Sequence, residues 1–566
     1  MRICRPDPRR FSMMANPNNS LNREAVVESR HFFEAVLVFM AFAVIMFITA
    51  PTNGAFAWSD APRHGLNGIF VRDFLIAMPW EDPRQYAVDY YLRYPALTIL
   101  FYPPLFSVFL AGSYSIFGFS HAVAQGTVAL FHLVLGLAGY MLARRWMAHG
   151  YAIAASLLLA GAPEIAFWGR QLMLDIPAYA WLVLMAVMFV RYLDHGENRY
   201  LWLTVALFVA AVYTKQTSLF VIFALAAGII ASQGCQAFRN PRLWIAAVVL
   251  LLLLVPLVLL QLKFGQVNTA SILGSQRADV SRLSIEAWTY YAAQLPSQLG
   301  WPTVILAVIY LVGAMLKPGW RLPRPHMVFV VTWFVAGYLF FSYIMVREPR
   351  HDLMALLPIP IFAVLATKEL AGSRFKKTGL IVAGAVTAGS VAWLLVAYPV
   401  HWVSGYSEVA DVVLKQAPRN SVVLFSGYRD GSFIFNIRAG QRSDISVARA
   451  DKLLLRVAIE RERGVQDRSL TADRIEELIK QHAIRYVVAE TGFWDDLPSM
   501  AALKSLLQDA NRFAVVRRIA TQANYPSTDG ELVVYRYLGE VDTDPLPLSA
   551  ELVGIGVTLK GGALVE

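Results

Sequence analysis

Carboxylates and cations that could perform acid–base and phosphate chemistry lie at the ends of apolar stretches of this sequence. A carboxylate can take a proton from an attacking hydroxyl, and Asp60 lies soon after the first apolar stretch. Arginine and lysine side chains bind phosphate oxygens, as forks or as point charges. The ionisable candidates for such a site are Asp60, Arg63, His64, Arg170, Asp175, Lys215, Arg347, Arg350 and His351.

These residues also have structural interpretations. Asp60 could cap a helix or lie in solvent, and Asp175, with Pro177 two residues later, is a good N-cap candidate. Lys215 and Arg170 could anchor their spans at the membrane interface, and the two late arginines could simply pair with neighbouring carboxylates. No single residue decides between these interpretations. Their common position at one face of a membrane favours a functional site.

The elements that must position these residues are apolar. The 566-residue chain is 57% hydrophobic and 16% charged, with a mean hydropathy of +0.48, whereas a soluble protein carries about 25% charged residues. Its apolar stretches are long enough to cross the roughly 30 Å hydrocarbon core as helices. The sequence predicts eleven spans, near residues 32–50, 121–143, 150–164, 176–193, 200–213, 217–232, 243–262, 301–316, 326–346, 353–367 and 378–398.

Basic residues set the predicted orientation. The net charge of +10 lies mostly in short loops between apolar stretches, which is typical of orientation signals and not of a nucleic-acid surface. If the further apolar stretch Leu97–Phe119 crossed the membrane, the basic loops after it would lie outside. It contains Pro103-Pro104 and many aromatic residues, which favour an interfacial or re-entrant segment. The N-terminus is then cytoplasmic, and the candidate residues lie outside.

The first apolar stretch could be a signal peptide, because Ala55-Phe56-Ala57 resembles a cleavage site. Its run from Phe32 to Ala50 exceeds the usual hydrophobic region of such peptides, so we expect a retained span. Cys4 and Cys235 both fall on the predicted cytoplasmic side and imply no disulfide framework.

Three regions follow: a cytoplasmic tail at 1–31, a membrane domain at 32–400 and an external α/β domain at 401–566. The membrane domain includes an external loop at 51–97 and the interfacial segment at 97–119. Alternating patterns in the last region predict strands at Ser421–Phe425, Tyr486–Ala489 and Leu532–Tyr535, a helix at Ala472–Gln481, and a turn at Gly427–Gly431.

Several motifs recur at the predicted outer face. They are Asp60 after the first span, Tyr94-Pro95 and Tyr102-Pro103-Pro104-Leu105, Arg170 with Asp175 and Pro177, Lys215-Gln216, and Arg347 with Arg350-His351 ahead of Pro358. With these motifs, approximately residues 30–400 resemble the GT-C superfamily of membrane glycosyltransferases. The bacterial branch of protein O-mannosyltransferases and lipid A aminoarabinose transferases is the most similar. Asp60 is followed by Ala61, where many relatives have Glu, which leaves metal dependence open.

The resemblance implies an inverting transfer from a polyprenyl-phosphate sugar to a hydroxyl acceptor at the outer face of a bacterial inner membrane. Asp60 would be the general base. Lys215, Arg347, Arg350 and Arg170 would bind the donor phosphate, and Asp175, Arg63, His64, Tyr102 and His351 would position the acceptor or the first loop. The expected partners are the lipid donor, the acceptor and membrane lipids. No cofactor is expected beyond a possible divalent metal. The α/β domain would be periplasmic.

Three other functions stay open. A transporter or flippase of a lipid-linked or anionic substrate would also place charges at span ends, although the sequence shows no convincing internal repeat. A non-catalytic scaffold in envelope assembly would tolerate loss of Asp60. A polymerase or ligase of undecaprenyl-diphosphate glycans would prefer a diphosphate donor.

Overall fold

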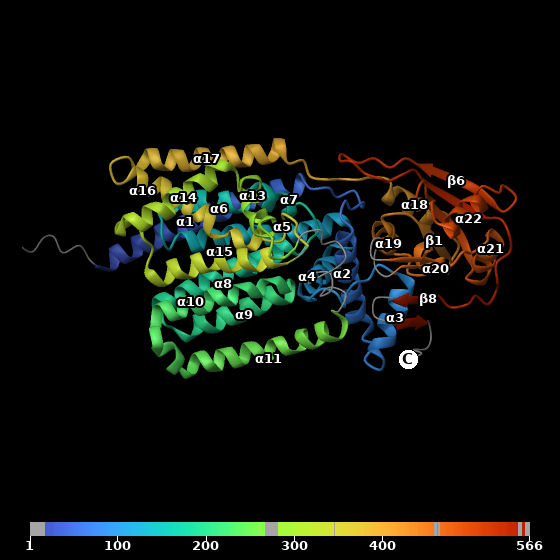
Figure 1. Cartoon of the computed structure of the whole chain (residues 1–566), viewed down its shortest axis with the longest axis horizontal. Coiled ribbons are helices and arrows are strands. Elements are labelled where there is room, and N and C mark those ends of the chain that lie inside the picture. The colour runs from blue at the N-terminus through green and yellow to red at the C-terminus, as the bar shows by residue number, and fades with distance from the viewer. Residues whose placement is uncertain are drawn as a thin grey trace, which may run out of the picture.

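The computed structural model describes residues 17–265, 281–344, 346–457, 461, 464–552 and 557–560. A bundle of long helices and an α/β domain lie end to end along the long axis of the molecule (Figure 1). The bundle consists of α1 (Pro17–Ile48), α5 (His121–Ala143), α6 (His149–Ala160), α7 (Pro163–Gly169), α8 (Asp175–His195), α9 (Asn198–Thr214), η2 (Gln216–Val221), α10 (Ile222–Gln233), η3 (Gly234–Arg239), α11 (Pro241–Phe264), α13 (Ile285–Leu299), α14 (Trp301–Leu316), η4 (Pro318–Trp320), α15 (Arg324–Tyr343), η5 (Leu353–Leu356), α16 (Pro358–Ala371) and α17 (Lys376–Ala397).

The helices of the bundle match the predicted spans. Among the described residues, eight helices are long and apolar enough to cross a membrane, and two bent pairs, α6 with α7 and α13 with α14, raise the number to ten. The eleventh predicted span is α9, which has 17 residues. The predicted interfacial segment contains the 13-residue α4 (Leu105–Phe117), whose length of about 20 Å is short of the hydrocarbon core. The protein is therefore a multi-span helical membrane protein.

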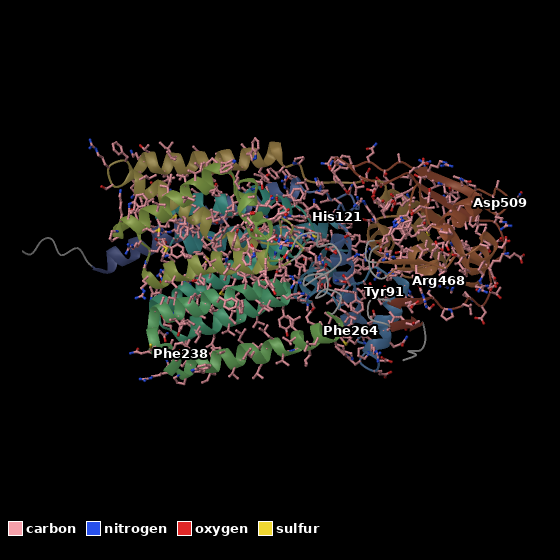
Figure 2. The ribbon with its side chains drawn as sticks, viewed as in Figure 1. Tyr91, His121, Phe238, Phe264, Arg468 and Asp509 are labelled. Atoms are coloured by element: carbon pink, nitrogen blue, oxygen red, sulfur yellow. The ribbon has the colours of Figure 1, made fainter. Side chains whose placement is uncertain are left out.

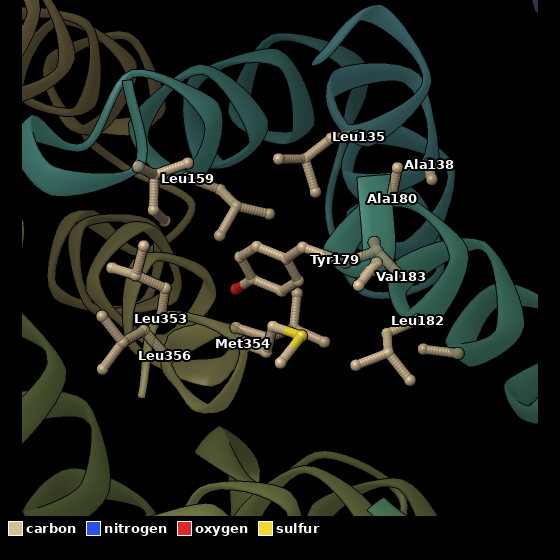
Figure 3. Close-up of a cluster of buried hydrophobic side chains, with 14 of the residues drawn as sticks. Leu135, Ala138, Leu159, Tyr179, Ala180, Leu182, Val183, Leu353, Met354 and Leu356 are labelled. Atoms are coloured by element: carbon tan, nitrogen blue, oxygen red, sulfur yellow. The ribbon is translucent and has the colours of Figure 1, made fainter. Parts of the chain in front are cut away.

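The centre of the bundle is a continuous apolar core. Tyr179 of α8 points into a cluster formed by α5, α6, α8 and η5, with Leu135, Leu159 and Met354 around its ring (Figure 3). These side chains are almost fully buried. Most of α11 instead exposes apolar side chains, as expected for a helix that faces lipid.

The basic loops gather at one end of the bundle, away from the α/β domain (Figure 1). Arg145 and His326 both pair with Asp194, and Arg144 pairs with Glu28 of α1. Phe238 of η3 marks this end, and His121 marks the end next to the α/β domain (Figure 2). The bundle therefore has a basic end and an end that faces the α/β domain, which is the division that the charge pattern predicts.

Two further helices, with α4, lie between the bundle and the α/β domain. These are α2 (Asp60–Ala77), which runs across the end of the bundle, and α3 (Pro83–Arg93) (Figure 1). The α/β domain then contains α18 (Tyr406–Gln416), β1 (Val422–Ser426), α19 (Asp430–Ala439), β2 (Ser446–Arg449), α20 (Ala450–Leu453), β3 (Leu455–Val457), β4 (Val465–Asp467), α21 (Ala472–Gln481), β5 (Ile484–Glu490), α22 (Pro498–Leu507), β6 (Phe513–Ile519), β7 (Leu532–Tyr537), β8 (Ser549–Leu552) and β9 (Val557–Lys560).

The main sheet has the strand order β2-β1-β5-β7-β6. Strands β1, β2 and β5 are parallel, and β7 is antiparallel to both β5 and β6. The three predicted strands are β1, β5 and β7, and the predicted helix is α21, so these predictions are confirmed. The predicted turn at Gly427–Gly431 is shorter than expected and ends at Arg429, because Asp430 already begins α19.

Close backbone approach joins α19 to α2. A Cβ added at Gly431 would lie 2.8 Å from Cγ of Pro62, and one added at Gly65 would lie 2.8 Å from a ring carbon of Phe435. Ion pairs extend the contact, with Arg438 bound to Asp73 of α2. The α/β domain is thus docked on the helix that begins with Asp60.

Gly431→Ala is expected to weaken this docking. The added methyl group would press on the rigid ring of Pro62, and such overpacking costs about 1–3 kcal/mol. We expect a lower apparent Tm in a thermal melt of the purified protein. Gly112→Ala, on α4, is the control, because no heavy atom lies within 4 Å of the added Cβ. An equal Tm for both variants would contradict the close contact.

Candidate active site

Asp60 is the first residue of α2. This helix lies across the end of the bundle that faces the α/β domain (Figure 1). Its side chain is partly exposed. His64, one turn later on the same helix face, is buried, and its ring meets the ring of Tyr102 edge-on with centroids 4.7 Å apart. The three side chains therefore form one polar group at the start of α2.

Burial controls the protonation of the two rings beside Asp60. It lowers the pKa of His64 to about 4, with the nearby carboxylates opposing the shift. Burial also raises the pKa of the Tyr102 hydroxyl, and the charge of Asp60 adds to that effect. At neutral pH His64 is therefore neutral, and Tyr102 keeps its proton and can donate it to a hydrogen bond.

Lys215, at the C-terminal end of α9, pairs with Asp175 at the start of α8. Nζ of Lys215 lies 2.5 Å from Oδ1 of Asp175, whose side chain is 4% exposed. The N-cap interpretation of Asp175 is wrong, because Leu174 occupies the cap position and the carboxylate turns to the lysine. Lys215 is itself half-buried with its ammonium bound to this carboxylate, which favours a role in the site over an anchor at the lipid surface.

Arg350 brings a second cation to the same place. Its Nε lies 2.7 Å from Oε2 of Glu348, and its guanidinium stacks 5.0 Å from the ring centroid of Trp168. Burial opposes its charge, but the carboxylates of Asp175, Glu348 and Asp60 outweigh that effect and raise its pKa. The neighbouring His351 is half-buried, and desolvation lowers its pKa to about 4, with the charge of Lys215 adding to the shift.

Five segments far apart in the sequence thus converge. The side chains of Asp60, His64, Tyr102, Asp175, Lys215, Arg350 and His351 act electrostatically on one another. The cluster combines a partly exposed carboxylate with two cations, which is the arrangement needed to deprotonate a hydroxyl and to stabilise a phosphate.

Three predicted residues bind elsewhere. Arg63 turns to the α/β domain, where its Nη2 lies 3.2 Å from Asp430. Arg170 is buried and donates to the carbonyl oxygens of Ala166 and Tyr398, and burial lowers its pKa to about 10. Arg347 donates to the carbonyl oxygen of Ser342. Arg63 thus joins α2 to the α/β domain, whereas Arg170 and Arg347 bind backbone carbonyl oxygens. The roles of these three residues in acceptor and phosphate binding stay predictions.

The structure also shows residues that sequence reasoning did not select. Glu348 and Trp168 orient Arg350, as described above, and Arg429 of the α/β domain donates to the carbonyl oxygen of Ala57 at 2.6 Å. Arg429 therefore fixes the chain just before Asp60. Its sequence signal is weak, because the segment 427–431 resembles an ordinary turn. Among the described residues, no group of three or more His, Cys, Asp or Glu side chains could hold a metal ion.

Gln298 of α13 fixes the loop that carries Arg350. Its amide donates to the carbonyl oxygen of Pro349 at 2.7 Å and to Oδ1 of Asp352 at 2.6 Å. Burial raises the pKa of Asp352 from its ordinary value of 3.8 to about 8, although the bond from Gln298 opposes the shift. The folded protein therefore holds this carboxyl in its neutral form at neutral pH.

This raised pKa predicts a stability that falls with pH. Between pH 3.8 and about 8 the folded state binds a proton at Asp352 that the unfolded state has released, so unfolding becomes easier as the pH rises. The cost at pH 8 is on the order of a few kcal/mol. Asp352→Asn, which mimics the neutral acid, should reduce the difference in Tm between pH 5 and pH 8. An unchanged difference would contradict the assignment.

The comparisons with known proteins agree with this architecture. Residues 102–259 match the family described as dolichyl-phosphate-mannose-protein mannosyltransferase. ArnT from Cupriavidus metallidurans, in the structure bound to undecaprenyl phosphate, superposes with a TM-score of 0.60 at 16% identity, over 90% of this chain and 99% of that one. The chain has the GT-C fold. The apo ArnT structure gives a TM-score of 0.59 at 16% identity, over 88% of this chain and 97% of ArnT.

A second GT-C protein is similar over much of the chain. The oligosaccharyltransferase from Archaeoglobus fulgidus, in its apo form, has a TM-score of 0.53 at 13% identity, over 91% of this chain and 75% of that one. No curated protein matches the sequence. The predicted resemblance to the GT-C superfamily is confirmed, and the matches support its ArnT and mannosyltransferase branch. The segment that matches the mannosyltransferase family includes Tyr102, Asp175 and Lys215.

Proposed function

We propose that this protein is an inverting glycosyltransferase that moves a sugar from a polyprenyl phosphate to a hydroxyl acceptor. The observation that carries the proposal is the cluster in which the partly exposed Asp60 lies near Arg350 and the Lys215–Asp175 pair, at the end of a GT-C bundle. The undecaprenyl phosphate bound to the similar ArnT structure supports a lipid donor of this class.

In the proposed step, Asp60 takes the proton of the acceptor hydroxyl while its oxygen attacks the anomeric carbon of the donor sugar. The bond between that carbon and the phosphate oxygen breaks, and the electron pair leaves with the phosphate. Attack from the side opposite the phosphate inverts the anomeric centre. Tyr102 keeps the carboxylate in place by lying against it with its hydroxyl protonated.

The leaving phosphate gains charge as the bond breaks, so fixed cations lower the barrier. We assign this role to Arg350 and Lys215. Arg350 presents a planar fork to phosphate oxygens, whereas Lys215 acts as a point charge. Asp175, which pairs with the lysine, holds that charge in position.

We place the reaction at the outer face of a bacterial inner membrane. The clusters at 144–145, 191–199, 239–242 and 368–377 belong to the basic end of the bundle, and the positive-inside rule assigns that end to the cytoplasm. The α/β domain, at the other end, is then periplasmic, and it covers the end of the bundle where acceptor and donor would meet.

The proposal is tested with purified protein in detergent and undecaprenyl-phosphate donors that carry radiolabelled mannose, glucose or aminoarabinose. Transfer of label to a hydroxyl acceptor, with release of undecaprenyl phosphate, would support it. Passage of an intact lipid donor across a vesicle membrane, without loss of its sugar, would support a flippase instead.

A further inference from the structure

A pocket of about 150 Å³ lies between the start of α2 and the α/β domain. One wall comes from Trp58 and Ser59, and the opposite wall comes from Arg429, Asp430, Thr528 and Asp529. Ser59 is exposed and directly precedes Asp60, so the pocket opens next to the proposed base. Asp60 lies outside the lining, so a ligand held there reaches the cluster by extending past Ser59.

The first wall of this pocket is aromatic. The ring of Trp58 is partly exposed and contacts Trp168 at a centroid distance of 4.8 Å and His401 at 5.9 Å. His401 in turn stacks on Tyr525 at 4.5 Å. These contacts fix the indole, which therefore offers a rigid apolar surface at low entropic cost. The C–H face of a sugar ring packs well against such a surface.

The second wall is polar and preorganised. Arg429 donates to Asp529 at 2.8 Å, and Arg449 lies 2.7 Å from Asp430. Asp529 also accepts from Ser527 and Tyr406, and Asp430 also accepts from Arg63, so several donors hold each carboxylate in place. The exposed hydroxyl groups of Ser59 and Thr528, both in the lining, can donate to a ligand or accept from it. A few fixed polar groups facing an apolar surface is the usual composition of a small-molecule site.

The charges of the pocket select against an anionic ligand. Its lining carries the carboxylates of Asp430 and Asp529 and one guanidinium, that of Arg429, which is already bound to Asp529 and to the carbonyl oxygen of Ala57. Asp430 is in turn paired with Arg63 and Arg449, so the charges around the pocket are already compensated. A phosphate would have to compete with these carboxylates for their guanidiniums, whereas a neutral ligand leaves the ion pairs intact. A neutral sugar fits this pattern better than a phosphorylated one.

We infer that this pocket binds a neutral sugar ring of a carbohydrate acceptor and presents a neighbouring hydroxyl to Asp60. The inference rests on the proposed function and defines its acceptor class. The α/β domain then contributes half of the acceptor site, and its docking on α2 completes that site.

The test blocks the pocket from its exposed wall. Thr528→Trp would fill it, and Gln522→Trp, the control, places the same bulk at an exposed position of the same loop outside the lining. Full-length protein in detergent is given the donor consumed in the assay above, with neutral trisaccharides (mannotriose, cellotriose or chitotriose) or a serine- and threonine-rich peptide as acceptors. Binding of radiolabelled undecaprenyl phosphate is measured separately.

We expect label on a trisaccharide, and Thr528→Trp should raise the KM for that acceptor by at least about tenfold, since a tenfold change corresponds to the loss of about 1.4 kcal/mol of binding. The control variant Gln522→Trp, which is a surface change, should stay within about twofold of the native protein. All variants should bind undecaprenyl phosphate equally.

Three results would overturn the inference: label on the peptide but on no trisaccharide, an unchanged KM in Thr528→Trp, or an equal loss of undecaprenyl phosphate binding in that variant. If the native protein releases sugar from none of the donors, the proposed function itself fails, and the acceptor site fails with it.

Discussion

Replacing Asp60 with asparagine is expected to lower kcat for sugar transfer by about 10²–10⁴-fold, the usual contribution of a general base. Asparagine keeps the size of the side chain but cannot accept the proton of the attacking hydroxyl. Donor binding should change little, because the phosphate contacts are assigned to Arg350 and Lys215. The measurement is initial-rate transfer by purified Asp60→Asn protein, with donor binding determined in parallel.

We expect Asp60→Asn to fold like the native protein, so that a lower kcat reports on the chemical step. Asp60 is partly exposed, so the neutral side chain leaves no buried charge without a partner. Asp89→Asn is a matched control, because this carboxylate is exposed on α3 next to α2 and lies outside the cluster. If Asp60→Asn retained the native kcat, Asp60 would not be the base.

Replacing Arg350 with glutamine is expected to lower kcat by about 10²–10³-fold, the usual cost of removing one group that stabilises developing charge. The effect should fall on kcat more than on the KM for the donor, because the phosphate gains its charge in the transition state. Arg350→Lys should recover only part of the rate. Lysine keeps the charge but loses the planar fork and the stacking on Trp168.

Arg350→Gln should not leave a buried carboxylate without a partner. The partner carboxylate, Glu348, is 40% exposed and can return to water, and Asp175 keeps its bond to Lys215. Arg199→Gln, an exposed arginine at the basic end of the bundle, is the control. A loss of donor affinity with native kcat would show that Arg350 binds the ground state alone.

Much of the fold was predictable because hydropathy reports on local burial. Runs of apolar residues predicted nearly every helix of the bundle, and the paired prolines at 103–104 correctly predicted that the segment before α5 is not a simple span. The positions of arginines in short loops predicted that one end of the bundle is basic and that the candidate site lies at the other end. Alternating patterns sufficed for β1, β5 and β7.

The partners of the site residues were less predictable. Arg63 and Asp430 are 367 residues apart, and no local pattern connects them. Asp175 looked like a helix cap because a short polar residue near proline usually is one, yet the half-buried Lys215 competes for its carboxylate. Trp168 resembles any apolar residue of a short helix, and its role appears only when Arg350 stacks on it.

The most direct test of this account is the sidedness of the cluster. Single-cysteine variants, Ser59→Cys without Cys4 and Cys235, and Cys4→Ser with Cys235 retained, are expressed in bacterial cells. An impermeant maleimide is then applied to intact spheroplasts. Cys235 is exposed and belongs to η3 at the basic end. We expect labelling at position 59 in intact spheroplasts, and at Cys235 only after permeabilisation. The reverse pattern would place Asp60 in the cytoplasm and contradict it.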